Sequence, residues 1–235
     1  MRHIKTLEKG FIKNILNQKE NPVVIEIGAH YGEDTKEFLE EFSDIEIYCF
    51  EPDPRNIKVI KKYIGTDKIN FFECAVSDSD DEEVEFFMAK KTAPPKVPKK
   101  YGWIDEEDYY GLGLNRSGAS SLKKGHPAVE NAEVTKVKTV KLDSWAADHN
   151  IEEVDFIWID VQGAEKNVIN GARELIKRTK FLYMEYGELG YNDAMSLDET
   201  TNLLKESGFS VYKVFKQGGK GDVLLKNDVL VLEEE

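Results

Sequence analysis

Short apolar runs alternate with amphipathic segments along most of the chain. Apolar residues at positions 4, 7, 11, 12, 15 and 16 follow helical spacing and predict an N-terminal helix over about residues 1–20, which ends at Asn21-Pro22. Strand, loop and helix then repeat, with apolar strands at 23–27, 45–50 and 69–76, a helix carrying Phe38, Leu39 and Phe42, and a helix at about 54–64. This alternation predicts parallel strands joined by right-handed crossovers.

The regular pattern breaks down between an edge strand at 84–88 and residue 134. Residues 90–100 hold three of the seven prolines and five lysines, so we predict an insertion at about 89–120. Residues 217–221 are rich in glycine and long enough for a hairpin, which makes the last strand antiparallel. After the insertion, the pattern predicts strands at 134–142, 154–160, 181–185, 210–215 and 222–232 and helices at about 144–148, 165–178 and 197–207.

These elements together predict one α/β domain over residues 1–235. Its core is expected to be a doubly wound, mostly parallel, seven-stranded sheet whose last strand is antiparallel. With 235 residues and a hydrophobic content of 40%, the chain has enough apolar material for such a core. Cys49 and Cys74 each lie in an apolar strand without metal-ligand spacing, so both are expected to be buried free thiols.

The overall charge narrows the range of partners. The 32 basic residues against 45 acidic ones give a net charge of -13, so long polyanions are repelled and nucleic acid is not an expected substrate. The first residues lack the apolar core of a signal peptide, and no stretch approaches the ~20 apolar residues that span a bilayer. We therefore expect a soluble, cytoplasmic protein that acts on a small molecule and does not bind a membrane.

The loop after the first predicted strand is a candidate binding site, because a doubly wound sheet binds ligands at the carboxyl ends of its strands. It reads Glu26-Ile27-Gly28-Ala29-His30-Tyr31-Gly32. A dinucleotide fingerprint would need glycine at positions 28, 30 and 33, and only position 28 has it, which argues against pyrophosphate and against a nicotinamide-dependent dehydrogenase. Glu26 can instead orient a cationic amino-acid group, so the loop favours S-adenosylmethionine.

Two later strand ends fit the rest of that cofactor. Glu51 ends the second predicted strand, where an acid in such folds hydrogen-bonds both ribose hydroxyls. The sequence Glu51-Pro52-Asp53-Pro54 is equally typical of a helix start, so this position alone does not decide. Cys74 and Ala75 follow the third strand and would lie beside the adenine ring, although a strand end and a turn would explain them too.

Asp160 is the main candidate for the chemistry. It ends the most apolar predicted strand, where a carboxylate is costly to bury without a function. We expect it to face the sulfonium of the cofactor and to remove the acceptor proton or orient the acceptor hydroxyl, with Glu185 as the alternative base. The structural alternative for Asp160 is an N-terminal cap of the following helix. Two carboxylates without further ligands are weak support for a metal, so no metal is expected.

The insertion is the candidate acceptor region. Trp103, Tyr109 and Tyr110 could stack against a sugar ring while neighbouring glycines let the segment close over it. A charged, proline-rich surface loop is the alternative, and the composition favours it slightly. His126 could line the same region, although a lone histidine in a polar loop is more often solvated than catalytic.

Five blocks in order resemble the FkbM family of S-adenosylmethionine-dependent methyltransferases. They are residues 25–32, 50–52, 75–78, 118–122 and 159–165, and the last is followed by Asn170-Gly171-Ala172. The resemblance implies a Rossmann-like class I methyltransferase fold and O-methylation of hydroxyl groups on sugars or polyketide-type natural products. Glu26, His30 and Gln162 depart from the Asp, Asn and Glu that are frequent in the family, so a catalytic charge at position 162 is not assumed.

The residues and the resemblance together give the expected site. Catalysis is expected from Asp160 and Glu185. The leading hypothesis is an O-methyltransferase for a small acceptor, with carbohydrate as one candidate, and a module that binds the cofactor without chemistry is the second hypothesis. Acceptor contacts are expected from Trp103, Tyr109, Ser120, Ser121 and His126. Cofactor contacts are expected from Glu26, Gly28, Ala29, His30, Gly32, Thr35, Glu51, Pro52, Cys74, Ala75, Asp160 and Gln162.

Overall fold

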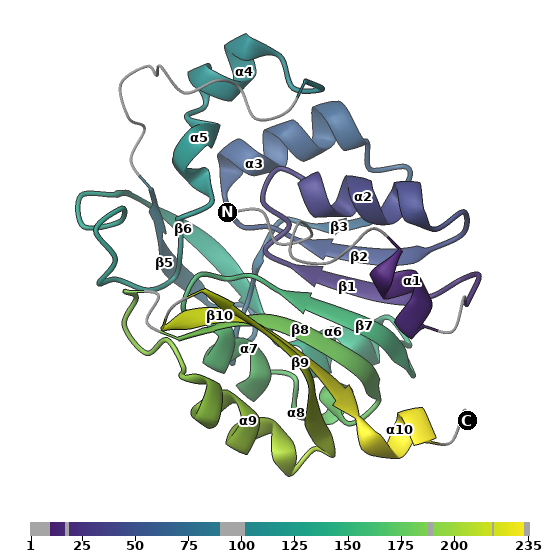
Figure 1. The fold of residues 1–235 in the computed structure, drawn as a ribbon. Helices are drawn as coiled ribbons and strands as arrows, with labels where there is room; N and C mark the ends of the chain where they lie inside the picture. The colour runs from purple at the N-terminus through teal and green to yellow at the C-terminus, as the bar shows by residue number, and fades with distance from the viewer. Residues whose placement is uncertain (1–9, 17–18, 90–101, 188–189, 218, 233–235) are drawn as a thin grey trace.

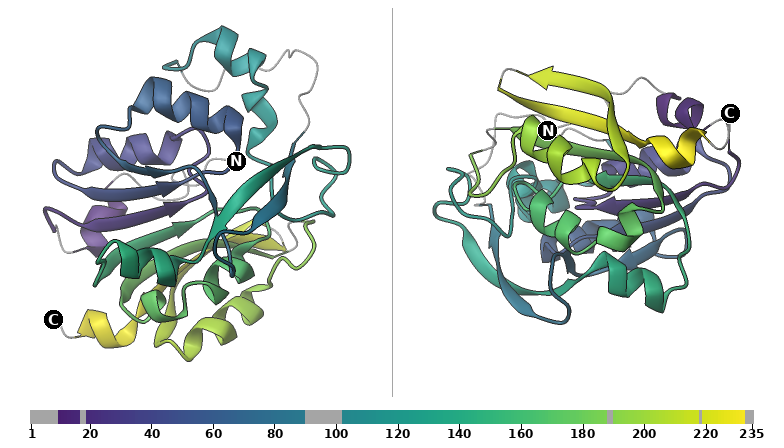
Figure 2. Two further views of the ribbon diagram at one scale, coloured as in Figure 1. Left: turned by 180° about the vertical axis from the view of Figure 1, so that it is seen from behind. Right: turned by 90° about the horizontal axis from the view of Figure 1, so that it is seen from below.

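A computed structural model describes residues 10–16, 19–89, 102–187, 190–217 and 219–232 of the chain. A central sheet lies between two layers of helices, and a smaller sheet lies beside it (Figure 1). Figure 2 shows the same arrangement from behind and from below, with the C-terminal hairpin along one edge of the central sheet. Within the described ranges, no helix combines the length and the apolar composition that crossing a membrane requires.

The main sheet has seven strands in the order β3-β2-β1-β7-β8-β10-β9. Neighbouring strands are parallel except for the pairs that β10 forms with β8 and β9, so the doubly wound sheet with an antiparallel last strand is confirmed. Strand order reverses between β1 and β7, and ligands bind at such a reversal. The strands are β1 Val23–Ile27, β2 Glu46–Phe50, β3 Asn70–Phe72, β7 Val154–Ile159, β8 Thr179–Gly187, β9 Phe209–Gln217 and β10 Lys220–Asn227.

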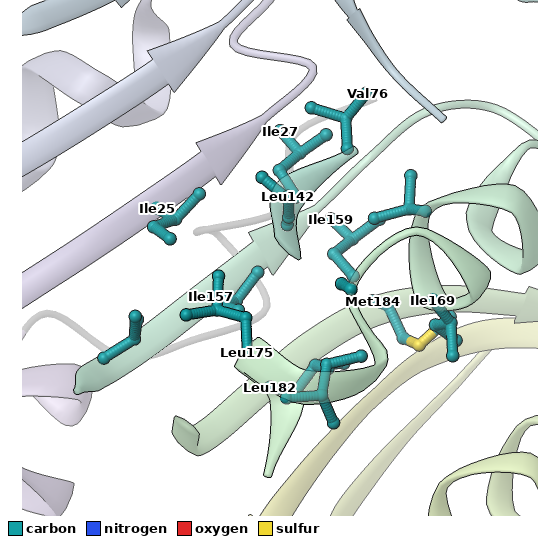
Figure 3. Packing of buried hydrophobic residues seen from close by; sticks show 14 of the residues in the cluster. Ile25, Ile27, Val76, Leu142, Ile157, Ile159, Ile169, Leu175, Leu182 and Met184 are labelled. Atoms are coloured by element: carbon teal, nitrogen blue, oxygen red, sulfur yellow. The ribbon is translucent and has the colours of Figure 1, made fainter. Parts of the chain in front are cut away.

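Apolar side chains on alternating sides of the central strands bury both faces of the sheet. Ile25 and Ile27 of β1 pack against one layer of helices, and Val24 packs against the other. Figure 3 shows the first of these cores, where side chains of β1, β7 and β8 meet those of the helical layer. That layer consists of α6 Leu142–Asp148, α7 Glu165–Asn170, α8 Arg173–Ile176 and α9 Leu197–Lys205. The opposite layer consists of α1 Phe11–Ile15, α2 Glu33–Glu41, α3 Pro54–Val59 and the π-helix η2 Ile60–Ile64.

The third predicted strand, at 69–76, is divided between two sheets. Its first part is β3 in the main sheet, whereas β4 (Ala75–Val76) pairs in parallel with β6 (Glu133–Val140). The edge strand β5 (Glu83–Met88) completes a three-stranded sheet in the order β4-β6-β5. Both halves of the segment are apolar, so hydrophobic periodicity alone does not reveal that the strand changes partners.

Two other predicted elements end earlier than expected. The helix at 165–178 is broken into α7 and α8 around Gly171, whose position leaves no room for a side chain: a Cβ there would lie 2.0 Å from the backbone oxygen of Ser77. The last strand ends at Asn227, and the chain continues as α10 (Asp228–Leu232). The side-chain oxygen of Asn227 accepts from the backbone N–H of Val229 at 3.2 Å, so this residue caps the new helix.

The insertion is partly helical within the described residues. It contains α4 (Glu106–Gly111) and α5 (Leu114–Ser117), which the sequence pattern did not predict. Residues 90–101 lie outside the described ranges, and so do residues 1–9 and 17–18 of the predicted N-terminal helix. Of that helix, the structure describes α1, which begins after Gly10.

Candidate functional site

The loop between β1 and α2 is wound tightly enough to need glycine at its first position. Gly28 has a φ of +85°, and a Cβ added to it would lie 1.9 Å from the backbone oxygen of Asp160. Gly32 also has a φ of +85°, where a Cβ would lie 2.8 Å from the side chain of Ile64. Gly28 therefore lets the loop pass directly beside the end of β7, and Gly32 lets α2 pack against η2.

A deep pocket opens at the carboxyl ends of the parallel strands. It encloses about 730 Å³ of space, its open mouth included. Its walls come from the ends of β1, β2 and β7, from β4, and from the segment that closes the insertion. The expected cofactor residues that line it are Gly28, His30, Glu51, Pro52, Cys74, Ala75, Asp160 and Gln162.

Glu51 is buried in the wall of this pocket and is held by hydrogen bonds. One carboxylate oxygen accepts from the backbone N–H of His30 at 2.8 Å, and the other accepts from the backbone N–H of Asp53 at 2.7 Å. Burial and the charge of Asp53 raise the pKa of Glu51 well above its usual range, although the N–H donors oppose this. Glu51 therefore joins the glycine loop to the start of α3.

Glu26 does not reach the pocket, contrary to the sequence-based expectation. Its carboxylate lies beneath the loop, where Thr35 Oγ1 donates to it at 2.5 Å and Cys49 Sγ donates to it at 3.4 Å. Burial raises the pKa of Glu26 to about 8. Ala29, Gly32 and Thr35 are also absent from the pocket wall among the residues that the structure describes. These four residues support the conformation of the loop and do not line the pocket.

His30 links the glycine loop to the insertion. Its φ of +53° is uncommon for a residue with a side chain. One ring nitrogen lies 3.0 Å from a carboxylate oxygen of Glu33, and the other lies 2.7 Å from Ser117 Oγ at the end of α5. Through this ring, helix α5 is fixed against the cofactor side of the sheet.

Asp160, Gln162 and Glu185 form one connected group at the ends of β7 and β8. The side-chain NH2 of Gln162 donates to Asp160 at 2.6 Å and to Glu185 at 2.9 Å. The expected pair of carboxylates is therefore brought together, with an amide between them. The alternative role of Asp160 as a helix cap does not fit, because α7 begins at Glu165 after Ala164. Burial raises the pKa of Glu165, which lies close to this group, to about 7.

Tyr191 completes the group and was not predicted from the sequence. Its hydroxyl donates to the backbone oxygen of Ala119 at 2.8 Å and lies 3.4 Å from Gln162 Oε1. Burial raises the pKa of this phenol, and so do the charges of Asp160 and Glu185. Within the part of the chain that the structure describes, no three side chains of His, Cys, Asp or Glu come together as a metal site.

Comparison with known proteins assigns this arrangement to a family. The Methyltransferase FkbM domain matches residues 26–211, which include the glycine loop and both carboxylates. The chain belongs to the FkbM methyltransferase family. A relative described as 2-O-methyltransferase NoeI, from Sinorhizobium fredii (strain NBRC 101917 / NGR234), is 32% identical over 217 residues, which cover 92% of this chain and 83% of that protein.

Solved structures resemble this FkbM methyltransferase to different degrees. The Methanococcus jannaschii fibrillarin pre-rRNA processing protein matches with a TM-score of 0.50 at 11% identity, over 89% of this chain and 68% of that chain. Aeropyrum pernix fibrillarin, solved with natively bound S-adenosyl-L-methionine, gives a TM-score of 0.46 at 12% identity, over 92% and 70% of the two chains. At such identities the likeness to the Methanococcus protein shows the class I fold alone.

The FkbM methyltransferase is an S-adenosylmethionine-dependent enzyme, and its pocket fits that cofactor. Gly28 lets the loop pass beside the end of β7 at the wall of the pocket, and Cys74 and Ala75 supply small side chains where a flat base can lie. Burial raises the pKa of the Cys74 thiol to about 12, so it presents an uncharged surface. Membership of this family does not favour the two alternatives considered from the sequence, a dehydrogenase and a binding module without chemistry.

The structure places several of the expected acceptor residues of the FkbM methyltransferase outside the pocket wall. Tyr109 is buried in a cluster with Val59, Ile104 and Leu114, and Trp103 packs edge-on against Tyr31. These rings hold the insertion on α3 and the glycine loop, so they are not free to stack on a sugar. The cause of this placement is that the insertion carries its own apolar core.

Three further expected residues act at the border of the pocket. Ser120 lines it, and its hydroxyl oxygen accepts from Arg55 Nη2 at 2.9 Å. Ser121 supports the loop above it by donating to the backbone oxygen of Gln162 at 2.7 Å. His126 does not line the pocket but stacks on Tyr191 with ring centroids 4.7 Å apart, and burial lowers its pKa.

Proposed function

We propose that this protein transfers the methyl group of S-adenosylmethionine to a hydroxyl oxygen of a small acceptor of the carbohydrate class. The observation that carries this is the group of Asp160, Gln162 and Glu185 beside the glycine loop. The two carboxylates offer several hydrogen-bond acceptors within a small space, which suits an acceptor with several hydroxyl groups. The description of the relative as a 2-O-methyltransferase supports oxygen as the methylated atom.

The residues suggest how the reaction is performed. The cofactor supplies an electrophilic methyl group on a sulfonium. Asp160 accepts a hydrogen bond from the acceptor hydroxyl and takes its proton as the oxygen attacks, while Gln162 fixes the orientation of the carboxylate. Glu185 accepts from the same amide and holds it in place. Because methyl transfer is an in-line displacement, holding the oxygen about 3 to 3.5 Å from the methyl carbon supplies much of the rate.

A nucleic acid acceptor does not fit this proposal. The chain carries a net charge of -13, and the pocket presents Asp160, to which Glu185 is joined through the amide of Gln162. A polyanion would meet like charge there, and long phosphate backbones bind to basic surfaces. We therefore include RNA in the test as a compound that should not be methylated.

The test is a methyl-transfer assay on an acceptor panel. The full chain is incubated with isotopically labelled S-adenosylmethionine and with monosaccharides, oligosaccharides, hydroxylated aromatic compounds, amines or RNA. We expect label on a hydroxyl oxygen of at least one carbohydrate, identified by mass spectrometry. Label on nitrogen alone, on RNA, or on the non-carbohydrate compounds alone would refute the proposed acceptor class.

Asp160→Asn is the matched variant for the mechanism. The asparagine keeps the shape and can still accept from Gln162, but it cannot take a proton. We expect turnover on the identified acceptor to fall by about 10²- to 10⁴-fold. Binding of S-adenosylhomocysteine, measured by calorimetry, should change by less than about threefold. Unchanged turnover would remove Asp160 from the proton transfer.

A further inference from the structure

Asn56 is a buried amide in the pocket wall with an unused hydrogen-bond acceptor. It lies in the first turn of α3, lines the pocket, and is 1% exposed. Its NH2 group donates to a carboxylate oxygen of Glu51 at 3.2 Å. Among the residues that the structure describes, its Oδ1 has no hydrogen-bond partner. A buried carbonyl oxygen without a donor is costly, so its place in the wall of a ligand pocket requires an explanation.

The hydrogen bonds of Glu51 provide that explanation. A carboxylate has about four acceptor sites on its two oxygens. Three of them are used by the backbone N–H groups of His30 and Asp53 and by the side chain of Asn56. One site is left, on the oxygen that accepts from His30. Protonation of Glu51, which its raised pKa favours, would reduce this capacity further.

The ribose of the cofactor has two adjacent hydroxyl groups, and each needs an acceptor when buried. Glu51 can accept a hydrogen bond from one of these hydroxyls at its remaining site, whereas the sequence pattern predicts that it binds both. We infer that Asn56 Oδ1 accepts the hydrogen bond of the second ribose hydroxyl, so that Glu51 and Asn56 each bind one hydroxyl of the sugar. The hydrogen bond between the two side chains keeps their acceptors next to each other.

Orientation of the Asn56 amide follows from its neighbour. Glu51 presents acceptor oxygens, so the NH2 group must face it and the carbonyl oxygen is left for the ligand. Among the hydrogen-bond donors of the cofactor, we favour the ribose hydroxyls as partners of Asn56. The reason is that Asn56 contacts Glu51, the residue expected at the ribose. The inference rests on the cofactor and not on the carbohydrate acceptor, and its test needs no turnover.

Calorimetry with S-adenosylhomocysteine and its 2′-deoxy and 3′-deoxy analogues tests the inference. In the unaltered protein, each deoxy analogue should bind more weakly by about three- to tenfold, the effect of one hydrogen bond. In Asn56→Leu, the parent compound should lose a similar factor. The penalty for one of the two analogues should then disappear, while the penalty for the other persists because Glu51 still accepts that hydroxyl.

Three controls keep the outcome decisive. Asn70→Leu removes an amide from β3, outside the pocket wall, and should leave all three affinities unchanged. Asn56→Ala serves if the leucine variant does not fold, as judged by its thermal unfolding. A crystal structure of the unaltered protein with S-adenosylhomocysteine should place a ribose oxygen within about 3.2 Å of Asn56 Oδ1.

Two results would overturn the inference. If both deoxy penalties survive in the Asn56 variants, Asn56 contacts neither hydroxyl. If both disappear together, Asn56 acts only by positioning Glu51 and is not itself a contact. Loss of methyl transfer with normal analogue discrimination would instead bear on the proposed acceptor chemistry, so the two failures are distinguishable.

Discussion

At Gly28 the backbone has a positive φ and passes against the end of β7. Alanine there would meet both the strain of the left-handed region and a Cβ 1.9 Å from the backbone oxygen of Asp160. We expect Gly28→Ala to lower the free energy of unfolding by about 3 kcal/mol and to abolish measurable S-adenosylmethionine binding. Urea denaturation and calorimetry measure the two effects.

Gly111→Ala is the control for this substitution. Gly111 ends α4, and nothing lies within 4 Å of a Cβ built on it. Its replacement should leave stability and cofactor affinity nearly unchanged. Near-normal cofactor binding by Gly28→Ala would mean that the close approach of the loop to β7 is not needed for the ligand.

Individual side chains were predictable where they end a strand. Asp160 and Glu185 come together because parallel strands end at one edge of the sheet. Glu26 lies away from the pocket wall, and the sequence carries a signal for this position: Glu26 stands between Ile25 and Ile27, which face the α6–α9 layer, so strand alternation turns it to the opposite face. Tyr191 contacts Gln162 although the two residues are 29 positions apart in the sequence, and no local pattern encodes such a contact.

At the scale of elements, the contact between His30 and Ser117 couples α5 to the glycine loop. In Ser117→Ala this hydrogen bond is lost, at a cost of about 1 kcal/mol. We expect faster hydrogen exchange in α4 and α5 and a few-fold weaker binding of S-adenosylmethionine, with exchange in β8 unchanged. Mass spectrometry of the exchanged protein measures the first effect.

Ser144→Ala provides the comparison, because Ser144 donates to Asp80 at 2.7 Å and does not line the cofactor pocket. It should lose a similar amount of stability without affecting α4, α5 or cofactor affinity. Equal exchange in the insertion of both variants would show that the His30 contact does not hold the insertion in place.

Most helices and strands were predictable because their apolar spacing is local. The exceptions have local physical causes that spacing does not register. Gly171 breaks a helix because Ser77, far away in the sequence, occupies the space of its side chain. The segment at 69–76 stays apolar while it passes from one sheet to another, so its pattern is that of a single strand. Contacts of Trp103 and Tyr109 depend on the insertion folding onto α3, which composition did not indicate.

For the whole molecule, the buried acids predict how stability depends on pH. Burial raises the pKa of Glu26 to about 8 and that of Glu165 to about 7. The folded state therefore holds protons that the unfolded state releases above about pH 4.5, so these groups stabilise the fold fully below that pH. Their contribution is lost as the pH rises towards 8. We expect the free energy of unfolding to decrease from pH 5 to pH 8.

Glu26→Gln isolates one of these groups. Glutamine can still accept from Thr35 but carries no charge to bury. We compare the free energy of unfolding of this variant with that of the unaltered protein by urea denaturation at each pH. The difference should change by on the order of 2 kcal/mol in favour of the variant as the pH rises from 5 to 8. Glu40→Gln, on the exposed side of α2, removes a carboxyl at the surface and serves as the control. Parallel stability curves for Glu26→Gln and the unaltered protein would contradict the expectation.

The segment at 69–76, which passes from one sheet to the other, affects how cooperatively the protein unfolds. The small sheet has a core of its own, formed by Ala75, Phe86, Met88 and Val137, and it meets the main core through Val76 and Val140. Cys74, Ala75 and Val76 line the cofactor pocket from this side, and Gly28 and Glu51 line it from the other. A ligand that contacts both walls joins two units that could otherwise open separately. Cofactor should therefore slow hydrogen exchange in β5 and β6 until it matches that of β1 and β7, and the enzyme would then unfold as a single unit.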